Sequence, residues 1–284
     1  MTKIFLFPGQ GAQRVGMGRA EFDRFPDLER QASDVLGYSV RRLCLEDPDG
    51  QLGDTRYTQP AMYVVNALAY RAKREEGLAP DMALGHSLGE YNALEAAGAF
   101  DFAEGLRLVA ARSAAMASIT GGGMTAVVGL DETYLRFLLR RAGFETLDLA
   151  NLNTPQQTVL AGPIDDLAEF EPILEDTGAR MVRRLAVSGP FHSRYMTPAA
   201  EAFAPELRAA AFGRLAFPVI ANCSARPYEN HRIAELLARQ IDHTVRWTES
   251  LQPLVNRDDV DFVEVGGTTL TSMIRQIRRA KEAT

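Results

Sequence analysis

The order of elements expected between residues 124 and 187 constrains the fold of this chain more than any other feature. The residue pattern there predicts a strand, a helix, two strands around a polar turn, a second helix and a last strand. Their ranges are 124–129, 131–142, 146–150, 157–161, 165–177 and 180–187. The β-α-β-β-α-β order is typical of a ferredoxin-like unit. We therefore expect a small ferredoxin-like domain over 124–187.

The sequence on either side has a different rhythm, with longer helices between short apolar strands. We expect strands over 3–7, 81–85, 217–221 and 261–265, a helix from about Met17, and helices over 58–76, 102–117, 197–210, 230–241 and 268–280. Thr58 is the expected N-cap of the helix that ends before Gly77. The pattern predicts an α/β fold in which residues 1–123 and 188–284 form one large domain, interrupted by the insert.

Composition excludes several classes of protein. The 284 residues carry a net charge of −6, which argues against a nucleic-acid enzyme. The two cysteines, Cys44 and Cys223, have no metal-like spacing and are expected to be buried thiols in a reducing compartment. The first apolar run is too short for a signal peptide, and no segment has the ~18 apolar residues of a membrane span. We expect a cytoplasmic protein.

The strongest local motif is Gly85-His86-Ser87-Leu88-Gly89, which fits the nucleophile elbow G-x-S-x-G. Such an elbow is a sharp strand-to-helix turn that exposes a serine hydroxyl, and small residues on both sides let neighbouring backbone approach. The apolar stretch before the motif and the helix expected up to about Ala97 give the required context. Ser87 is therefore a candidate nucleophile, and it needs a base within hydrogen-bonding reach.

Four histidines could supply that base. His86 adjoins the serine and its side chain should diverge from it, His231 lies in a polar helix start, and His243 has no motif around it. His192 lies in a loop between the insert and the next helix, where catalytic groups often collect. The alternative is that His192 merely bonds a loop carbonyl.

Two further features each allow more than one interpretation. The segment Phe7-Pro8-Gly9-Gln10-Gly11 follows a strand but lacks the third glycine of a dinucleotide loop and the Lys of a phosphate-binding loop. It is either a tight turn or an oxyanion loop that holds a backbone N–H beside the elbow. Arg112, in a mostly apolar helix, either reaches the surface or pairs with an anion, and the residues alone favour the surface.

Taken together, these motifs resemble one known family along nearly the whole chain: the malonyl-CoA:acyl carrier protein transacylases of fatty acid synthesis and the discrete, trans-acting acyltransferases of polyketide synthases. The resemblance implies an α/β-hydrolase-like large domain with a ferredoxin-like insert. The residues that carry it, besides Arg112, are Phe7–Gly11, Tyr57–Ala61, Gly85–Glu90, Asn151–Pro155, Gly189–Ser193 and Glu264–Gly266.

The resemblance also implies roles for individual residues. Ser87 would be the nucleophile and His192 its general base and then acid, with the N–H groups of Gln10 and Leu88 as the oxyanion hole. Arg112 would hold the free carboxylate of the substrate. Met116 and Phe191 would line the acyl pocket, Asn153 would also contact substrate, and a backbone carbonyl near Gln240 would orient the histidine.

The implied activity is transfer of a malonyl group from malonyl-CoA, through a malonyl-serine ester, to the phosphopantetheine thiol of an acyl carrier protein. It would need no cofactor and no metal, and the enzyme would be a monomer. In the family, Leu after the serine and Phe before the histidine accompany malonyl, as Leu88 and Phe191 do here, although Gly189-Pro190 departs from the His-Ala of modular enzymes. The residues do not separate fatty acid from polyketide synthesis.

Two other functions fit parts of the pattern. A proofreading acyl hydrolase would share the elbow and the histidine but tends to lack the arginine, so Arg112 argues against it. A non-catalytic module that binds carrier proteins would need none of Ser87, His192 and Gln10. The basic residues Arg180, Arg183 and Arg184 form a candidate surface for an acidic carrier protein, or simply a solvated face.

Overall fold

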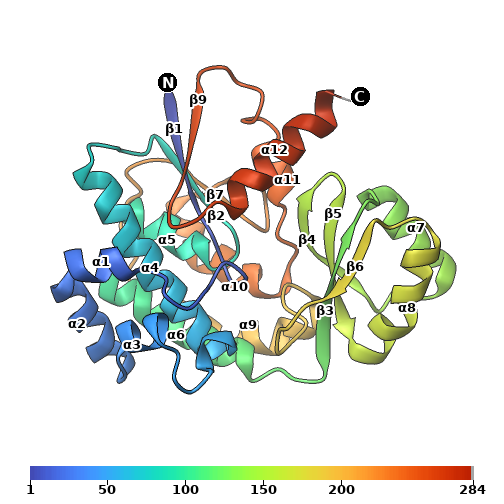
Figure 1. Ribbon diagram of the computed structural model, residues 1–284, viewed down its shortest axis with the longest axis horizontal. Coiled ribbons are helices and arrows are strands. Elements are labelled where there is room, and N and C mark those ends of the chain that lie inside the picture. Colours follow the sequence, from blue (N-terminus) through green and yellow to red (C-terminus); the bar gives the residue numbers. More distant parts are fainter. Residues whose placement is uncertain (283–284) are drawn as a thin grey trace.

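Two β-sheets organise the chain (Figure 1). The computed structural model describes the backbone of residues 1–282 and the side chains of residues 1–280. A five-stranded sheet has the order β8-β7-β2-β1-β9, and a four-stranded sheet has the order β4-β5-β3-β6. In Figure 1 the four-stranded sheet lies to the right with helices α7 and α8 on its outer side, and the remaining helices surround the larger sheet.

The larger sheet is parallel apart from one short edge strand. Its strands are β1 (Thr2–Phe7), β2 (Met82–Gly85), β7 (Val219–Ala221), β9 (Val260–Glu264) and the antiparallel β8 (Arg226–Pro227). Along β1, Phe5 and Phe7 join the main core while Ile4 and Leu6 join a second core on the opposite face. Because successive side chains point to opposite faces and both faces are covered, the strand is a continuous apolar run.

Most of the helices pack on the two faces of this sheet. On the side of the main core lie α1 (Arg19–Arg24), α2 (Pro26–Leu36), α3 (Val40–Leu45), α4 (Thr55–Glu75), α5 (Gly89–Ala96), α6 (Phe102–Ala117), α9 (Thr197–Ala209) and α10 (Ile233–Asp242). The opposite face is covered by α11 (Trp247–Leu251) and α12 (Thr269–Glu282). Among the described residues, no helix is both long enough and apolar enough to cross a membrane.

The four-stranded sheet has the expected β-α-β-β-α-β order, with every neighbouring pair antiparallel. Its elements are β3 (Gly122–Val128), α7 (Glu132–Ala142), β4 (Asp148–Thr154), β5 (Gln157–Pro163), α8 (Ile164–Asp176) and β6 (Met181–Arg184). One face packs on α7 and α8 through Val127, Leu149 and Leu160. The other face turns Met124 and Ala126 toward the main core, so the insert forms part of the site described below.

A backbone ladder joins β4 to the chain that follows α10. The Val245 N–H donates to the Ala150 carbonyl at 2.8 Å, and the Leu152 N–H donates to the Val245 carbonyl at 2.9 Å. The Thr244 hydroxyl adds a bond of 2.8 Å to the Leu149 carbonyl. The inserted sheet is therefore hydrogen-bonded to the segment just after α10, in addition to its two covalent junctions.

Several expected boundaries were wrong for identifiable reasons. Helix α4 begins at Thr55, because the Asp54 carboxylate caps it by accepting from the Arg56 N–H, a cap worth about 1 kcal/mol. Thr58, expected as the cap, lies inside the helix, and its hydroxyl donates to the carbonyl of Leu52, which precedes the helix. The helix expected over 230–241 begins as a 3₁₀ turn before α10.

The last strand of the insert is also shorter than expected, because β6 pairs with β3 only from Met181 to Arg184. Helices α2, α3 and α11 were not predicted. Cys44 and Cys223 are free and buried, as expected.

Candidate active site

The elbow around Ser87 lies between the end of β2 and the start of α5. Ser87 has a φ of 50°, in the left-handed region that few side chains other than glycine adopt. A Cβ on Gly85 would lie 1.9 Å from the Gly89 carbonyl carbon, and a Cβ on Gly89 would lie 2.0 Å from the Phe7 oxygen. The motif therefore needs both glycines because backbone crosses backbone at this turn.

Asn222, just after β7, holds the elbow from the other side. Its Oδ1 accepts from the Ser87 N–H at 2.7 Å, and its Nδ2 donates to the Gly85 carbonyl at 2.7 Å. The left-handed conformation of Ser87 is thus stabilised by a side chain that lies far along the sequence. No motif in the sequence pointed to Asn222.

His192 reaches Ser87 from the loop that follows the insert. Its Nε2 lies 2.8 Å from the Ser87 Oγ, and its Nδ1 lies 2.7 Å from the Gln240 carbonyl oxygen. Because a carbonyl can only accept, Nδ1 carries the proton and Nε2 is left to accept from the serine hydroxyl. The geometry is that of a nucleophile with its base and a group that orients the base.

The His192 ring is buried and held neutral. Burial lowers the pKa of His192 to about 3, and the nearby positive charge of Arg112 acts in the same direction. The residue itself has a φ of 60°, so the loop is strained where it presents the ring. A neutral imidazole is the form that can take a proton from Ser87.

Two backbone N–H groups beside Ser87 have no acceptor within the described part of the chain, namely those of Gln10 and Leu88. Both residues line the same small cavity as Ser87. The loop that carries Gln10 lies close to the elbow, since a Cβ on Gly9 would come within 2.3 Å of the His86 carbonyl oxygen. Unpaired N–H groups that converge near a nucleophile can bind an oxyanion.

Arg112, on α6, is fully buried, so the surface interpretation of this residue is wrong. Its Nη1 donates to the Gln59 Oε1 at 2.5 Å, and its Nη2 donates to the Gln240 Oε1 at 2.7 Å and to the Ser87 Oγ at 3.2 Å. Its Nε has no partner among the described residues. A buried cation that contacts the serine hydroxyl is suited to an anionic group of the substrate.

Gln240 connects Arg112 to a buried carboxylate. Its Nε2 donates to the Ser87 carbonyl at 2.7 Å and to the Glu90 Oε2 at 2.6 Å. Glu90 also accepts from the Tyr228 hydroxyl at 2.5 Å, and burial raises the pKa of Glu90 to about 7. Gln240 therefore serves twice, with its backbone carbonyl on the histidine and its side chain on the arginine.

The cavity beside Ser87 has a volume of about 90 Å³. Its lining includes the expected Gln10, Leu88, Met116 and Phe191. Gln59 and Asn151, which also line it, belong to segments that carry the resemblance, and His86 belongs to the elbow motif. The sequence did not suggest Met124, Leu185 and Val187, which line it from the insert.

Asn153 is placed differently from Asn151. It is not among the lining residues, and its Oδ1 accepts from the His86 Nε2 at 2.8 Å. The pairing of β4 with β5 is irregular between Leu152 and Thr154, so the simple alternation of a strand does not hold at Asn153.

A larger cavity, about 960 Å³, lies between the β4–β5 turn and α12. It is lined by Gln156, Arg180 and Arg279 among others, but by no serine, cysteine or histidine. Within the described chain no group of three or more His, Cys, Asp or Glu residues is placed to hold a metal ion. The chemistry therefore centres on the smaller cavity.

Of the three arginines considered as a surface for a carrier protein, Arg184 forms an ion pair with Glu171 at 2.8 Å. Arg180 donates to the Gln156 Oε1 at 2.8 Å. Arg183 is exposed and has no polar partner among the described residues.

Comparison with known proteins gives several relatives. The chain is 47% identical to the polyketide biosynthesis malonyl CoA-acyl carrier protein transacylase BaeC of Bacillus velezensis over 282 residues, 98% of each chain. It is 46% identical to the polyketide biosynthesis protein PksE of Bacillus subtilis over 281 residues, but spans only 37% of that protein's length.

Solved structures agree with these matches. A malonyl CoA-acyl carrier protein transacylase from Burkholderia pseudomallei superposes with a TM-score of 0.94 at 48% identity, covering 98% of both chains. A malonyl-transacylase in complex with its type II PKS acyl-carrier protein gives 0.92 at 33% identity, covering 98% of this chain and 94% of that one. The acyl transferase domain matches residues 4–282, and the chain belongs to the acyl transferase family.

Proposed function

We propose that the protein is a malonyl-CoA:acyl carrier protein transacylase that works through a malonyl ester on Ser87, in polyketide or fatty acid biosynthesis. The observation that carries the proposal is the position of Arg112. Its guanidinium lies 3.2 Å from the Ser87 Oγ, which in turn lies 2.8 Å from the His192 Nε2. A nucleophile, a base and a buried cation within one cavity fit an acyl group that carries its own carboxylate.

The first half-reaction follows from the geometry. The Ser87 Oγ attacks the thioester carbon of malonyl-CoA while its proton passes to the His192 Nε2. The N–H groups of Gln10 and Leu88 stabilise the oxyanion that forms. The carbon–sulfur bond then breaks, and the coenzyme A sulfur takes the proton from His192. The product is a malonyl-serine ester with the free carboxylate on Arg112.

The second half-reaction reverses these steps with another thiol. The phosphopantetheine thiol of an acyl carrier protein gives its proton to His192 and attacks the ester, so the malonyl group moves to the carrier and Ser87 is restored. The scheme needs no resident cofactor or metal, because the partners supply both thiols. The name of the superposed complex, a transacylase with its carrier protein, supports this partner.

The shape of the cavity supports malonyl as the acyl group. About 90 Å³ bounded by Met116, Phe191 and Leu88 leaves little room for a branched extender unit. We infer that a carboxylate on Arg112 and a small apolar wall together select a short dicarboxylic acyl chain. In the family, Leu and Phe at the positions of Leu88 and Phe191 go together with malonyl as the acyl group.

We further infer that residues 1–123 and 188–284 form an α/β-hydrolase-like domain and residues 124–187 a ferredoxin-like insert. The parallel sheet with its elbow after β2 supports the first assignment, and the antiparallel order β4-β5-β3-β6 supports the second. We propose that the enzyme acts as a monomer in the cytoplasm.

Intact-mass measurement tests the activity directly. Purified protein is incubated with malonyl-CoA, and a holo acyl carrier protein is added afterwards. We expect an adduct of one malonyl group that is absent in Ser87→Ala and moves to the carrier. The presence of Arg112 favours a transacylase over an acyl hydrolase, and the same assay tests this choice. A malonyl adduct lost to water at the same rate with and without carrier would identify a hydrolase.

A further inference from the structure

The loop that carries His192 is held by hydrogen bonds at the histidine itself and again two residues later, at Arg194. On the upstream side the His192 N–H donates to the Ile241 carbonyl at 3.1 Å, beside the Gln240 carbonyl that receives Nδ1. A φ of 60° persists only where surrounding contacts over-determine it. The downstream contacts therefore matter to the position of the ring.

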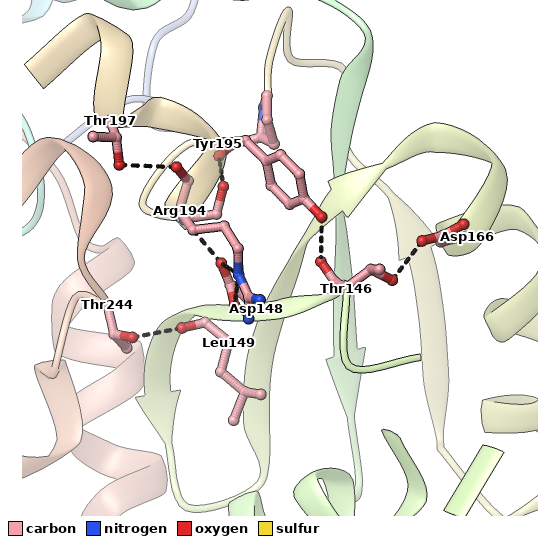
Figure 2. A network of polar contacts seen from close by, with 10 residues as sticks. Thr146, Asp148, Leu149, Asp166, Arg194, Tyr195, Thr197 and Thr244 are labelled. Atoms are coloured by element: carbon pink, nitrogen blue, oxygen red, sulfur yellow. Dashed lines mark hydrogen bonds and ion pairs between the residues drawn. The ribbon is translucent and has the colours of Figure 1, made fainter. Parts of the chain in front are cut away.

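Two residues after the histidine, the chain is fixed to the inserted sheet by Asp148, on β4 (Figure 2). The Asp148 Oδ2 accepts from the Arg194 N–H at 2.8 Å. Both carboxylate oxygens accept from the Arg194 Nε at 3.0 Å, and Oδ1 also accepts from Nη2. A carboxylate that holds one residue by backbone and side chain together fixes its direction as well as its place.

Neighbouring contacts make Asp148 a firm anchor. The Tyr195 hydroxyl donates to the Thr146 carbonyl at 2.9 Å, and the Thr197 hydroxyl donates to the Asp242 Oδ2 at 3.0 Å. Thr244 bonds the carbonyl of Leu149, the next residue on β4 (Figure 2). The strand that holds Arg194 is thus tied to the same end of α10 that holds His192.

We propose that Asp148 is a positioning residue for His192: its carboxylate, through the backbone N–H of Arg194, keeps the loop in the conformation that aims Nε2 at Ser87. The exposed part of the Arg194–Asp148 ion pair contributes little by itself, since the Arg194 side chain is 60% exposed. The bond to the backbone is the part that acts on the histidine. The proposal rests on the Ser87–His192 pair of the proposed function, and not on the identity of the acyl group.

Serine reactivity measures this role without any substrate. A fluorophosphonate probe forms a bond between phosphorus and the Ser87 Oγ, fluoride leaves, and His192 takes the hydroxyl proton. We expect Asp148→Ala to slow labelling by at least about 10-fold, because displacement of a catalytic group by about 1 Å costs up to about 100-fold. Arg194→Ala, which leaves the backbone N–H in place, should slow it by less than about 3-fold.

Two variants keep the test decisive. Asp148→Asn retains an oxygen for the Arg194 N–H and should restore most of the rate. Asp259→Ala removes an exposed ion pair of the same kind, with Arg257 at 2.6 Å, and should label like the wild type. Melting temperatures are recorded for all variants. If Asp148→Ala does not fold, an Asp148→Asn protein that labels at least about 10-fold more slowly than the wild type overturns the proposal.

The outcomes separate cleanly. Labelling of Asp148→Ala at the wild-type rate, or slowed only as far as in Arg194→Ala, would overturn the proposal, and so would Asp148→Asn behaving like Asp148→Ala. Wild-type protein that does not label at all would instead count against the Ser87–His192 pair. A wild type that labels but does not accept malonyl would leave the role of Asp148 intact while contradicting the proposed substrate.

Discussion

Arg112 and His192 are buried side by side against Ser87, although one must stay charged and the other neutral. Burial and the neighbouring cation lower the pKa of His192, while the amide oxygens of Gln59 and Gln240 stabilise the charge of Arg112. Two titratable groups with pKa values pushed apart have separate tasks. Here one group handles the proton and the other an anion.

Replacing Arg112 should reduce the preference for malonyl-CoA more than it reduces the rate with an uncharged acyl thioester. Arg112→Ala removes a paired, buried contact to the malonyl carboxylate, worth about 2–3 kcal/mol, or about 30- to 150-fold. We expect the ratio of kcat/KM for malonyl-CoA over acetyl-CoA to fall by that factor. The check is the rate of serine acylation with each thioester. An equal loss for both substrates would contradict the role of Arg112.

The pH dependence follows from the lowered pKa of His192. An ordinary histidine base is half protonated near pH 6.5, whereas His192 with a pKa of about 3 stays neutral well below that. We expect kcat/KM for acylation to lack an inflection at pH 6.5 and to persist down to about pH 5. Glu90, with a pKa of about 7, titrates within the pH range over which acylation is measured. Glu90→Gln is therefore the control that isolates the histidine.

Stability should respond to the same two groups in opposite directions. Because the folded pKa of His192 is depressed, its contribution is full above pH 6.5 and is lost as the pH falls toward 3. Because the folded pKa of Glu90 is raised, its contribution is full below about pH 4.5 and is lost as the pH rises through 7. Melting curves of Glu90→Gln should therefore decline less than wild type between pH 5 and pH 8.

At the scale of elements, the loop after β1 and the elbow after β2 work as one unit. Gly9 lets the two approach, and the N–H of Gln10 depends on that approach. Gly9→Ala would place a Cβ 2.3 Å from the His86 oxygen and push the loop away. We expect acylation to slow by about 100-fold or more, the usual cost of losing one oxyanion donor.

Gly53→Ala is the matched control, because nothing lies within 4 Å of a Cβ at that position. Acylation rates and melting temperatures of the two variants are compared. A Gly9→Ala enzyme as fast as Gly53→Ala would show that the loop can shift without losing the Gln10 N–H.

The elements were largely predictable because their signals are local. Helix α6 falls on the expected 102–117, and the order of the insert is the expected one. Contacts between distant segments were not predictable from the residues alone. Asn222, which holds the elbow, has no spacing or motif that marks it. Glu90 ends the elbow segment, but nothing in the sequence indicated its contact with Gln240. Arg112 shows the same limit, since its helix favoured a surface position until tertiary contacts placed the guanidinium against Ser87.

At the scale of the whole molecule, the insert carries the arginines expected to contact an acidic carrier protein. Arg184 pairs with Glu171, which leaves Arg183 exposed without a polar partner among the described residues. Arg183→Glu should lower kcat/KM for the acidic carrier protein by about 10-fold and leave serine acylation by malonyl-CoA unchanged. Arg74→Glu, at the end of α4, is the control. Equal transfer rates in both variants would exclude this face for docking.

The attachment of β4 to Val245 bears on how such enzymes can be recombined. Residues 124–187 look like a cassette that could be exchanged between relatives at its two chain junctions. The backbone hydrogen bonds at Val245 and the bonds between Asp148 and Arg194 also join the insert to the rest of the chain, apart from the two covalent junctions. In a chimera joined only at residues 123/124 and 187/188, the contacts of β4 with Val245 and Arg194 would pair residues from two different proteins, close to His192. Exchange should succeed when the segments 188–197 and 240–248 travel with the insert.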